Sequence, residues 1–209
     1  MKTIVISPHD NQPPQGLIVL LHGWGANARD LASLAPLLRL PDYQFVCPDA
    51  PFPHPHVPEG KMWYDLETSE YVGLADSQTL LTDWLNGLEA TTGVPPSRTL
   101  VAGFSQGGAM ALDVGLNRDR PQPFAGLVAF SGYLHAPIES AIATRPPVLI
   151  LHGTQDPIVP VAAARQARDL LTQLGIAAQY REFDIAHEIC PEEIALTREF
   201  VLNAMARSQ

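Results

Sequence analysis

The stretch that most constrains the fold is Gly103-Phe104-Ser105-Gln106-Gly107. An apolar run at 100–102 precedes it and a run of small residues at 109–112 follows, so it reads as Gly-x-Ser-x-Gly between an expected strand and an expected helix. A serine on so sharp a turn adopts a strained backbone, and the positions two residues to either side must lack a Cβ for strand and helix to approach. We therefore expect the Ser105 hydroxyl to project from the turn beside the free N–H groups that open the helix. A Gly-Ser turn with no catalytic role can have the same sequence. Other residues of the chain are therefore needed to distinguish a catalytic serine from a simple turn.

Length and charge limit the classes of protein that fit. The chain has 209 residues and is 46% hydrophobic, enough for one sizeable core, and we expect residues 1–209 to form a single domain. The formal net charge is −9 and the basic residues are scattered, which disfavours nucleic acid and anionic membrane surfaces as partners. The longest apolar runs, such as 17–21, have the length of a strand, so we expect no integral membrane association.

The cysteines and histidines suggest neither a disulfide scaffold nor a metal site. The apolar run at 4–6 is too short for a secretory signal, and Cys47 and Cys190 are isolated, so we expect two reduced thiols in a cytoplasmic protein. Because no Cys or His pair has the spacing of zinc ligands, we expect no metal.

Strand-like and helix-like segments alternate along the chain. Apolar or alternating runs predict strands at 2–7, 17–21, 44–47, 99–102, 124–130, 147–151 and 177–183, the first and last at sheet edges. Periodic runs with capping residues predict helices over 27–38, 77–88 with a stop at Gly93, 106–117, 160–174 and 191–204. This order predicts an α/β fold in which a mostly parallel sheet is covered by helices on both faces.

The segment 49–70 follows neither a helix nor a strand period. It is rich in proline and carries Phe52, Met62 and Trp63, which linkers rarely do. A long loop of this kind is usually functional, so we interpret it as a pocket wall or a minimal lid rather than a solvent-facing linker. Together with Trp24, these three side chains are the expected contacts of an apolar acyl group.

Four polar residues each come just after a predicted strand: His22, Ser105, Asp156 and His187. The carboxyl ends of parallel strands share one edge of a sheet, so the topology brings these residues together. The order serine, acid, histidine is the one expected when a Gly-x-Ser-x-Gly turn lies on this architecture. We interpret Ser105 as the nucleophile, His187 as the general base and then acid, and Asp156 as the carboxylate that orients the imidazole.

Other residues compete for some of these roles. The alternative acids are Asp113, Asp119, Asp184 and Glu188, and Asp156 is favoured because Pro157 fixes its turn. Among the other histidines we expect His22 and His152 to anchor loops, and we place His9, His54, His56 and His135 on the surface or in loops.

A reaction through a tetrahedral anion also needs N–H donors already aimed at the oxygen. The backbone N–H of Gln106, directly after the serine, is one candidate. We expect the N–H of Trp24 to be the second, because Gly23 and Gly25 allow that loop to turn its amides inward.

Taken together, these motifs resemble a known family. They are Leu21-His22-Gly23-Trp24-Gly25, Trp63-Tyr64-Asp65, Gly103-Phe104-Ser105-Gln106-Gly107-Gly108, the run from His152 to Pro160, and Ala186-His187-Glu188. In this order they are similar to the small carboxylesterase and acyl-protein thioesterase branch of the α/β-hydrolases. The resemblance covers nearly the whole chain and implies a cofactor-free serine hydrolase with no separate cap domain, the triad Ser105, Asp156 and His187, and the oxyanion amides of Trp24 and Gln106. Many members carry a smaller aliphatic residue in place of Trp24 and glycine in place of Ala186.

We therefore expect a carboxylesterase that acts on short- to medium-chain apolar acyl groups through an acyl-serine intermediate. The same triad would serve an acyl-protein thioesterase or a lysophospholipase, and also a cofactor-free perhydrolase. A non-catalytic receptor with a hydrolase fold is a further alternative, although such proteins usually lack a triad member. The sequence does not predict the oligomeric state.

Overall fold

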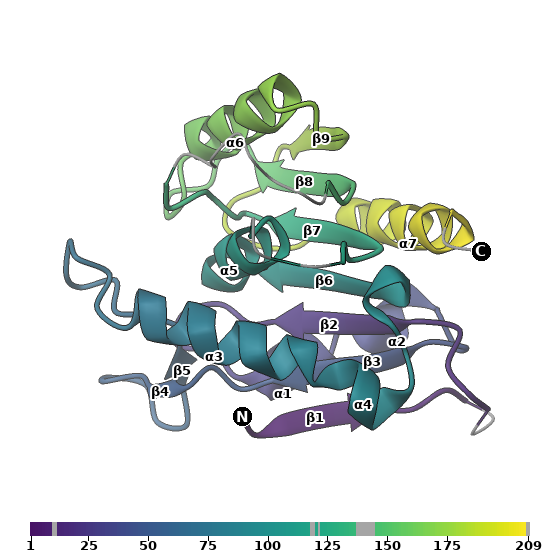
Figure 1. Ribbon diagram of the computed structural model, residues 1–209. Coiled ribbons are helices and arrows are strands. Elements are labelled where there is room, and N and C mark those ends of the chain that lie inside the picture. The colour runs from purple at the N-terminus through teal and green to yellow at the C-terminus, as the bar shows by residue number, and fades with distance from the viewer. Residues whose placement is uncertain (10–11, 118–119, 121, 137–144, 208–209) are drawn as a thin grey trace.

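A seven-stranded sheet runs through the middle of the molecule (Figure 1). The computed structural model describes residues 1–9, 12–117, 120, 122–136 and 145–207. The strands of the sheet are β1 (Thr3–Ile6), β2 (Leu17–Leu21), β3 (Gln44–Pro48), β6 (Thr99–Phe104), β7 (Gly126–Phe130), β8 (Val148–Gly153) and β9 (Ala178–Phe183). Their spatial order is β1-β3-β2-β6-β7-β8-β9, and β1 alone is antiparallel to its neighbour. The predicted mostly parallel sheet with edge strands at both ends is confirmed.

Helices cover both faces of this sheet (Figure 1). They are α1 (Ala28–Ala32), α2 (Ala35–Leu38), α3 (Leu74–Asn86), α4 (Leu88–Thr92), α5 (Gln106–Gly115), α6 (Val161–Gln173) and α7 (Pro191–Ala206), with a 3-10 turn η1 at Pro96–Arg98. One hydrophobic cluster packs α3, α4, α5 and α6 on one face, and a second packs α1, α2 and α7 on the other. Because β2, β6 and β7 have apolar side chains on both faces, they read as unbroken apolar runs in the sequence.

Two predicted helices are each divided by a short break. The helix expected over 27–38 is two short helices, and Pro36 lies in the first turn of the second, where its missing N–H costs nothing. The Asn27 side chain accepts a hydrogen bond from Arg29 N–H in a capping box. The helix expected from 77 begins earlier, at Leu74, and Gly87 separates α3 from α4 before Gly93 ends the run.

The proline-rich segment 49–70 contains a small hairpin that its sequence did not predict. Strands β4 (Phe52–Pro53) and β5 (Lys61–Met62) pair antiparallel, with Phe52 opposite Met62. Lys61 is bonded through its backbone to Gly25 and Ala26 of the loop after β2. The segment is therefore held against the strand-end edge.

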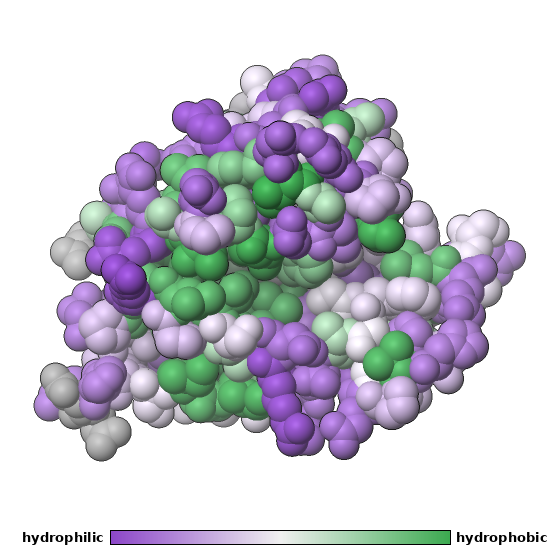
Figure 2. All heavy atoms as spheres, turned by 180° about the vertical axis from the view of Figure 1, so that it is seen from behind, coloured by the Kyte–Doolittle hydropathy of each residue, from purple (hydrophilic) through white to green (hydrophobic). Residues whose placement is uncertain are grey.

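Figure 2 shows the face opposite α3 and α5, where hydrophobic side chains occupy the middle and hydrophilic ones the border. Helices α2 and α7, whose buried residues belong to the second cluster, also carry one exposed leucine each, Leu37 and Leu202. No helix in the described part of the chain is long and apolar enough to cross a bilayer. The polar candidates of the sequence lie elsewhere, in the loops that follow β2, β6, β8 and β9.

Candidate active site

Ser105 occupies the strained turn between β6 and α5. Its φ is 55° and its ψ −118°, a conformation that side chains rarely adopt, and its N–H donates to the carbonyl of Phe130 at 2.8 Å. A Cβ at Gly103 would lie 2.1 Å from the carbonyl oxygen of Gly107, and one at Gly107 would lie 2.1 Å from that of Leu21. Both glycines are therefore needed for strand and helix to approach as they do.

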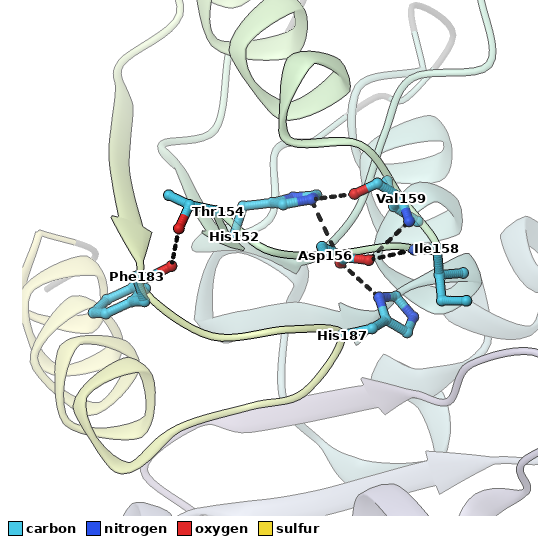
Figure 3. A network of polar contacts seen from close by, with 7 residues as sticks. All are labelled: His152, Thr154, Asp156, Ile158, Val159, Phe183 and His187. Carbon is cyan, nitrogen blue, oxygen red and sulfur yellow. Dashed lines mark hydrogen bonds and ion pairs between the residues drawn. The ribbon is translucent and has the colours of Figure 1, made fainter.

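Asp156 and His187 form a close pair after β8 and β9 (Figure 3). The Nδ1 of His187 lies 2.6 Å from Oδ2 of Asp156, and because a carboxylate only accepts, Nδ1 carries the proton. The other carboxylate oxygen, Oδ1, accepts the backbone N–H groups of Ile158 and Val159, each at 2.9 Å. In the neutral imidazole this tautomer leaves Nε2 of His187 as the nitrogen that can accept a proton.

The surroundings of Asp156 favour its charged form. Burial acts to raise the pKa of this carboxyl, but the hydrogen bonds from His187, Val159 and Ile158 outweigh it and the pKa lies below its ordinary value. The Asp156 side chain has no exposed surface, so only its partners offset the cost of burying the charge.

The ring of His187 packs against Phe104, the residue before the serine, with ring centroids 4.7 Å apart. Within the described residues, no hydrogen bond joins the Ser105 hydroxyl to the His187 imidazole. Such bonds are often long in an enzyme without substrate and shorten when substrate binds. The expected contact between Asp156 and His187 is thus formed. The expected hydrogen bond between Ser105 and His187 stays a prediction.

His152 lies beneath this pair as a buried anchor, as its sequence position predicts. Its Nε2 donates to the carbonyl of Val159 at 2.8 Å and lies 3.6 Å from Asp156 Oδ2 (Figure 3). The side chain has no exposed surface. His152 therefore supports the turn that presents Asp156.

The two amides predicted to bind an oxyanion lie directly after two neighbouring strands, β2 and β6. Gln106 is the first residue of α5, and Trp24 follows β2, which pairs with β6 so that Leu21 is opposite Gly103. Among the described groups, neither backbone N–H donates a hydrogen bond to the protein. Both donors remain available for a ligand.

The predicted acyl contacts differ in their exposure. Trp24, Phe52 and Met62 are half-buried, and each keeps some surface near the hairpin of segment 49–70. Trp63 has no exposed surface and belongs to the hydrophobic core. Its predicted contact with substrate is therefore not supported, because its indole faces inward and donates to the carbonyl of His22.

A second Asp–His pair lies in the molecule and was not recognised from the sequence. Asp113 of α5 accepts from Nδ1 of His135 at 2.7 Å and from Gln78 at 2.9 Å. The His135 side chain is only 6% exposed, and the rings of Tyr64, Tyr71 and Tyr133 pack edge-on around it. With its carboxylate engaged here, Asp113 does not face His187.

The other expectations for acids and histidines can be compared with the same structure. Asp184 is exposed and bonded to Gln155, and Glu188 is exposed; Asp119 lies outside the described residues. His9 and His56 are exposed. His54 and His135 lie in loops, as the surface or loop assignment allows, but both side chains are buried, and the ring of His54 packs against Trp24 with ring centroids 4.2 Å apart. Among the described residues, no three His, Cys, Asp or Glu side chains are grouped so as to hold a metal ion.

The chain is similar in sequence and in structure to known proteins. The family model described as phospholipase/carboxylesterase matches residues 2–204. Acyl-protein thioesterase 1 of Mycosarcoma maydis is 32% identical over 93% of each chain, and that of Saccharomyces cerevisiae is 29% identical over 93% of this chain and 95% of its own. The crystal structure of esterase PE8 is 35% identical, with a TM-score of 0.89 over 96% of this chain and 97% of that one. The similarity thus extends over nearly the full length of the chain.

Proposed function

The chain belongs to the phospholipase/carboxylesterase family and has the α/β-hydrolase fold, and we propose that it hydrolyses carboxylic esters through an acyl intermediate on Ser105. The observation that best supports this is the 2.6 Å contact between Asp156 and His187 at the strand-end edge that also carries the strained serine. That contact holds the proton of the neutral imidazole on Nδ1 of His187 and leaves Nε2 as the base.

The proposed reaction proceeds in two halves. In the first, the Ser105 oxygen attacks the acyl carbon while its proton moves to Nε2 of His187. The anionic tetrahedral oxygen is stabilised by the N–H groups of Trp24 and Gln106. Collapse expels the alcohol, which takes the proton from Nε2 and leaves acyl-Ser105.

In the second half, water attacks the acyl-serine. The water gives a proton to Nε2 of His187, and a second tetrahedral anion forms in the same donor pair. Its collapse releases the carboxylic acid and returns the proton to the Ser105 oxygen. Asp156 stabilises the imidazolium in both halves without taking its proton.

The half-buried apolar side chains Trp24, Phe52 and Met62 support short- to medium-chain apolar acyl groups as substrates, with segment 49–70 as the pocket wall. Residues 1–209 act as one domain in this proposal. A cytoplasmic location stays a prediction of the sequence, to be tested by cell fractionation.

Thioester hydrolysis is the second candidate, because relatives that align over 93% of this chain are named acyl-protein thioesterases. Oxygen esters and thioesters require the same nucleophile and the same anion donors. The ratio of kcat/KM values for butyrate esters and thioesters with matched leaving groups separates the two activities.

The test of the main proposal is turnover of p-nitrophenyl butyrate by the wild-type protein, Ser105→Ala and the control Ser131→Ala. Ser131 is also buried with a positive φ of 47°, so it is a matched serine in a neighbouring loop. We expect turnover to be lost with Ser105→Ala alone. Turnover retained by Ser105→Ala would contradict the proposed nucleophile, and no turnover by a folded wild-type protein would favour a receptor.

A further inference from the structure

The side chain of Gln106 is tied to the loop that ends in Trp63 and Tyr64. Its Oε1 accepts the backbone N–H of Trp63 at 2.8 Å, and its Nε2 donates to the carbonyl of Tyr64 at 2.7 Å. The Gln106 side chain is fully buried, and its two partners, a donor and an acceptor, assign the orientation of its amide. The first residue of α5, which carries one proposed oxyanion donor, is thus fixed to segment 63–64.

The indole of Trp63 continues this connection on its other side. Its Nε1 donates to the carbonyl of His22 at 3.0 Å, and the two rings lie 5.7 Å apart. Trp63 has no exposed surface, so a lost partner there would leave a buried polar group without a hydrogen bond. Trp63 therefore links the serine turn to the loop after β2.

His22 connects Trp63 to the second proposed donor, the N–H of Trp24. Its Nδ1 donates to the carbonyl of Gly23 at 2.8 Å, and its Nε2 accepts the N–H of Ala50 at 3.0 Å. The Gly23 carbonyl and the Trp24 N–H belong to one planar, trans peptide unit, so holding the carbonyl fixes the direction of the N–H. Burial lowers the pKa of His22, which is consistent with the neutral tautomer that these partners require.

Strand pairing alone does not set the position of this loop. Leu21 is the last residue of β2 with a partner in β6, and the chain continues through Gly23 and Trp24 beyond the sheet. A Cβ at Gly23 would lie 3.3 Å from the Phe104 ring and 3.5 Å from Cβ of Ser105, so this loop packs directly on the serine turn. A small displacement of the loop would move one donor relative to the other.

We propose that Trp63 is a positioning residue that holds the N–H groups of Gln106 and Trp24 in fixed relation through one buried chain of hydrogen bonds. The inference rests on the proposed function, because it matters only if those two amides bind the tetrahedral anion. It also replaces the substrate contact expected for Trp63 with a role behind the site. The proline-rich segment then contributes to turnover from within the core.

The test compares Trp63→Phe with the control Trp84→Phe. Trp84 packs against the same hydrophobic cluster from α3 but is only half-buried, so the control makes the same substitution away from the donor loops. For Trp63→Phe we expect kcat for p-nitrophenyl butyrate to fall about 10- to 100-fold with KM within about twofold of wild type. The Ki of an alkyl boronic acid, an analogue of the tetrahedral anion, should rise by about the same factor.

A second variant interrupts the same chain of hydrogen bonds at Gln106. Gln106→Met keeps the backbone N–H but loses both side-chain hydrogen bonds, and it should show the same loss of kcat and of boronic acid affinity. The double variant, Trp63→Phe with Gln106→Met, should have a kcat little lower than that of either single variant, because both substitutions interrupt the same chain of hydrogen bonds. Independent structural damage would instead give losses that multiply.

The outcomes separate this inference from the proposed function. A folded wild-type protein without turnover would refute the function itself. A wild-type enzyme with turnover, together with a Trp63→Phe variant that matches Trp84→Phe in kcat and Ki, would overturn only the positioning role. Failure of both Trp63→Phe and Gln106→Met to fold, measured by circular dichroism, would also overturn it and assign Trp63 to stability alone.

Discussion

Asp156 holds His187 with one carboxylate oxygen and the backbone with the other. Oδ2 lies 2.6 Å from Nδ1 of the imidazole, while Oδ1 accepts the N–H groups of Ile158 and Val159. The carboxylate is therefore oriented by its own turn whether or not the histidine is present. The role of Asp156 in orienting the imidazole can therefore be tested separately from its role in the fold.

Asp156→Asn tests that separation. The amide oxygen can still accept the two backbone N–H groups, but its NH₂ would then face Nδ1 of His187 and favour the wrong tautomer. We expect kcat for p-nitrophenyl butyrate to fall on the order of 10⁴-fold while the melting temperature changes little. Asp113→Asn makes the same change in the second Asp–His pair and should leave kcat near wild type. If the two variants have equal activity, Asp156 is not the orienting acid.

The tight contact across the serine turn gives a prediction about glycine. In Gly107→Ala the new Cβ would lie 2.1 Å from the Leu21 carbonyl oxygen, so α5 and β2 must separate. We expect a loss of about 3 kcal/mol in the free energy of unfolding, measured by urea titration, together with lost turnover. The control is Gly87→Ala, where the nearest atom to a new Cβ lies at 3.5 Å and φ is −80°. That variant should be neutral or more stable by roughly 0.4–1 kcal/mol, and a Gly107→Ala variant as stable as this control would contradict the packing argument.

The sequence predicts the sheet and the strand-end residues well because both depend on short-range rules. Buried parallel strands appear as continuous apolar runs, and topology alone brings their carboxyl ends to one edge. The need for glycine at 103 and 107 follows from the same reasoning, and the close carbonyl contacts agree with it. Asp156 could be chosen over Asp113 because Pro157 marks a turn directly after a strand.

The direction of a side chain in an irregular loop does not follow from such rules. The sequence of the proline-rich segment does not indicate whether the indole of Trp63 faces substrate or core. Only the hydrogen-bond partners of its backbone N–H and its indole N–H distinguish these cases. The pairing of Asp113 with His135 joins a helix to a later loop and has no spacing signal. The sequence does not predict the break at Gly87, because a single glycine inside a helical period is often tolerated.

Glu193 gives a prediction about stability and pH. It lies in the first turn of α7, is 1% exposed, and accepts the N–H of Cys190 at 2.9 Å. Burial raises its pKa from 4.5 to about 7, so the folded protein holds this proton more tightly than the unfolded chain. Its contribution to stability is complete below about pH 4.5 and is lost as the pH rises through about 7. Glu193→Gln, which removes the charge, should equal wild type near pH 4 and exceed it by roughly 1–3 kcal/mol near pH 9.

The measurement is the free energy of unfolding by urea at both pH values. Glu192→Gln is the matched control, because Glu192 lies in the same helical turn but is exposed. It should show no gain at high pH, since an exposed carboxylate is already solvated there. A difference between wild type and Glu193→Gln that stays constant from pH 4 to pH 9 would refute the assignment.

The most direct test of the central claim is to find where a fluorophosphonate attaches. The reagent transfers its phosphonyl group to an activated serine oxygen with loss of fluoride, and peptide mass spectrometry locates the adduct. We predict one adduct per chain, on Ser105, with labelling slowed strongly in Asp156→Asn and unaffected in Asp113→Asn. An adduct on Ser131 or another residue, or no adduct on a folded wild-type protein, would contradict the proposed nucleophile and the mechanism built on it.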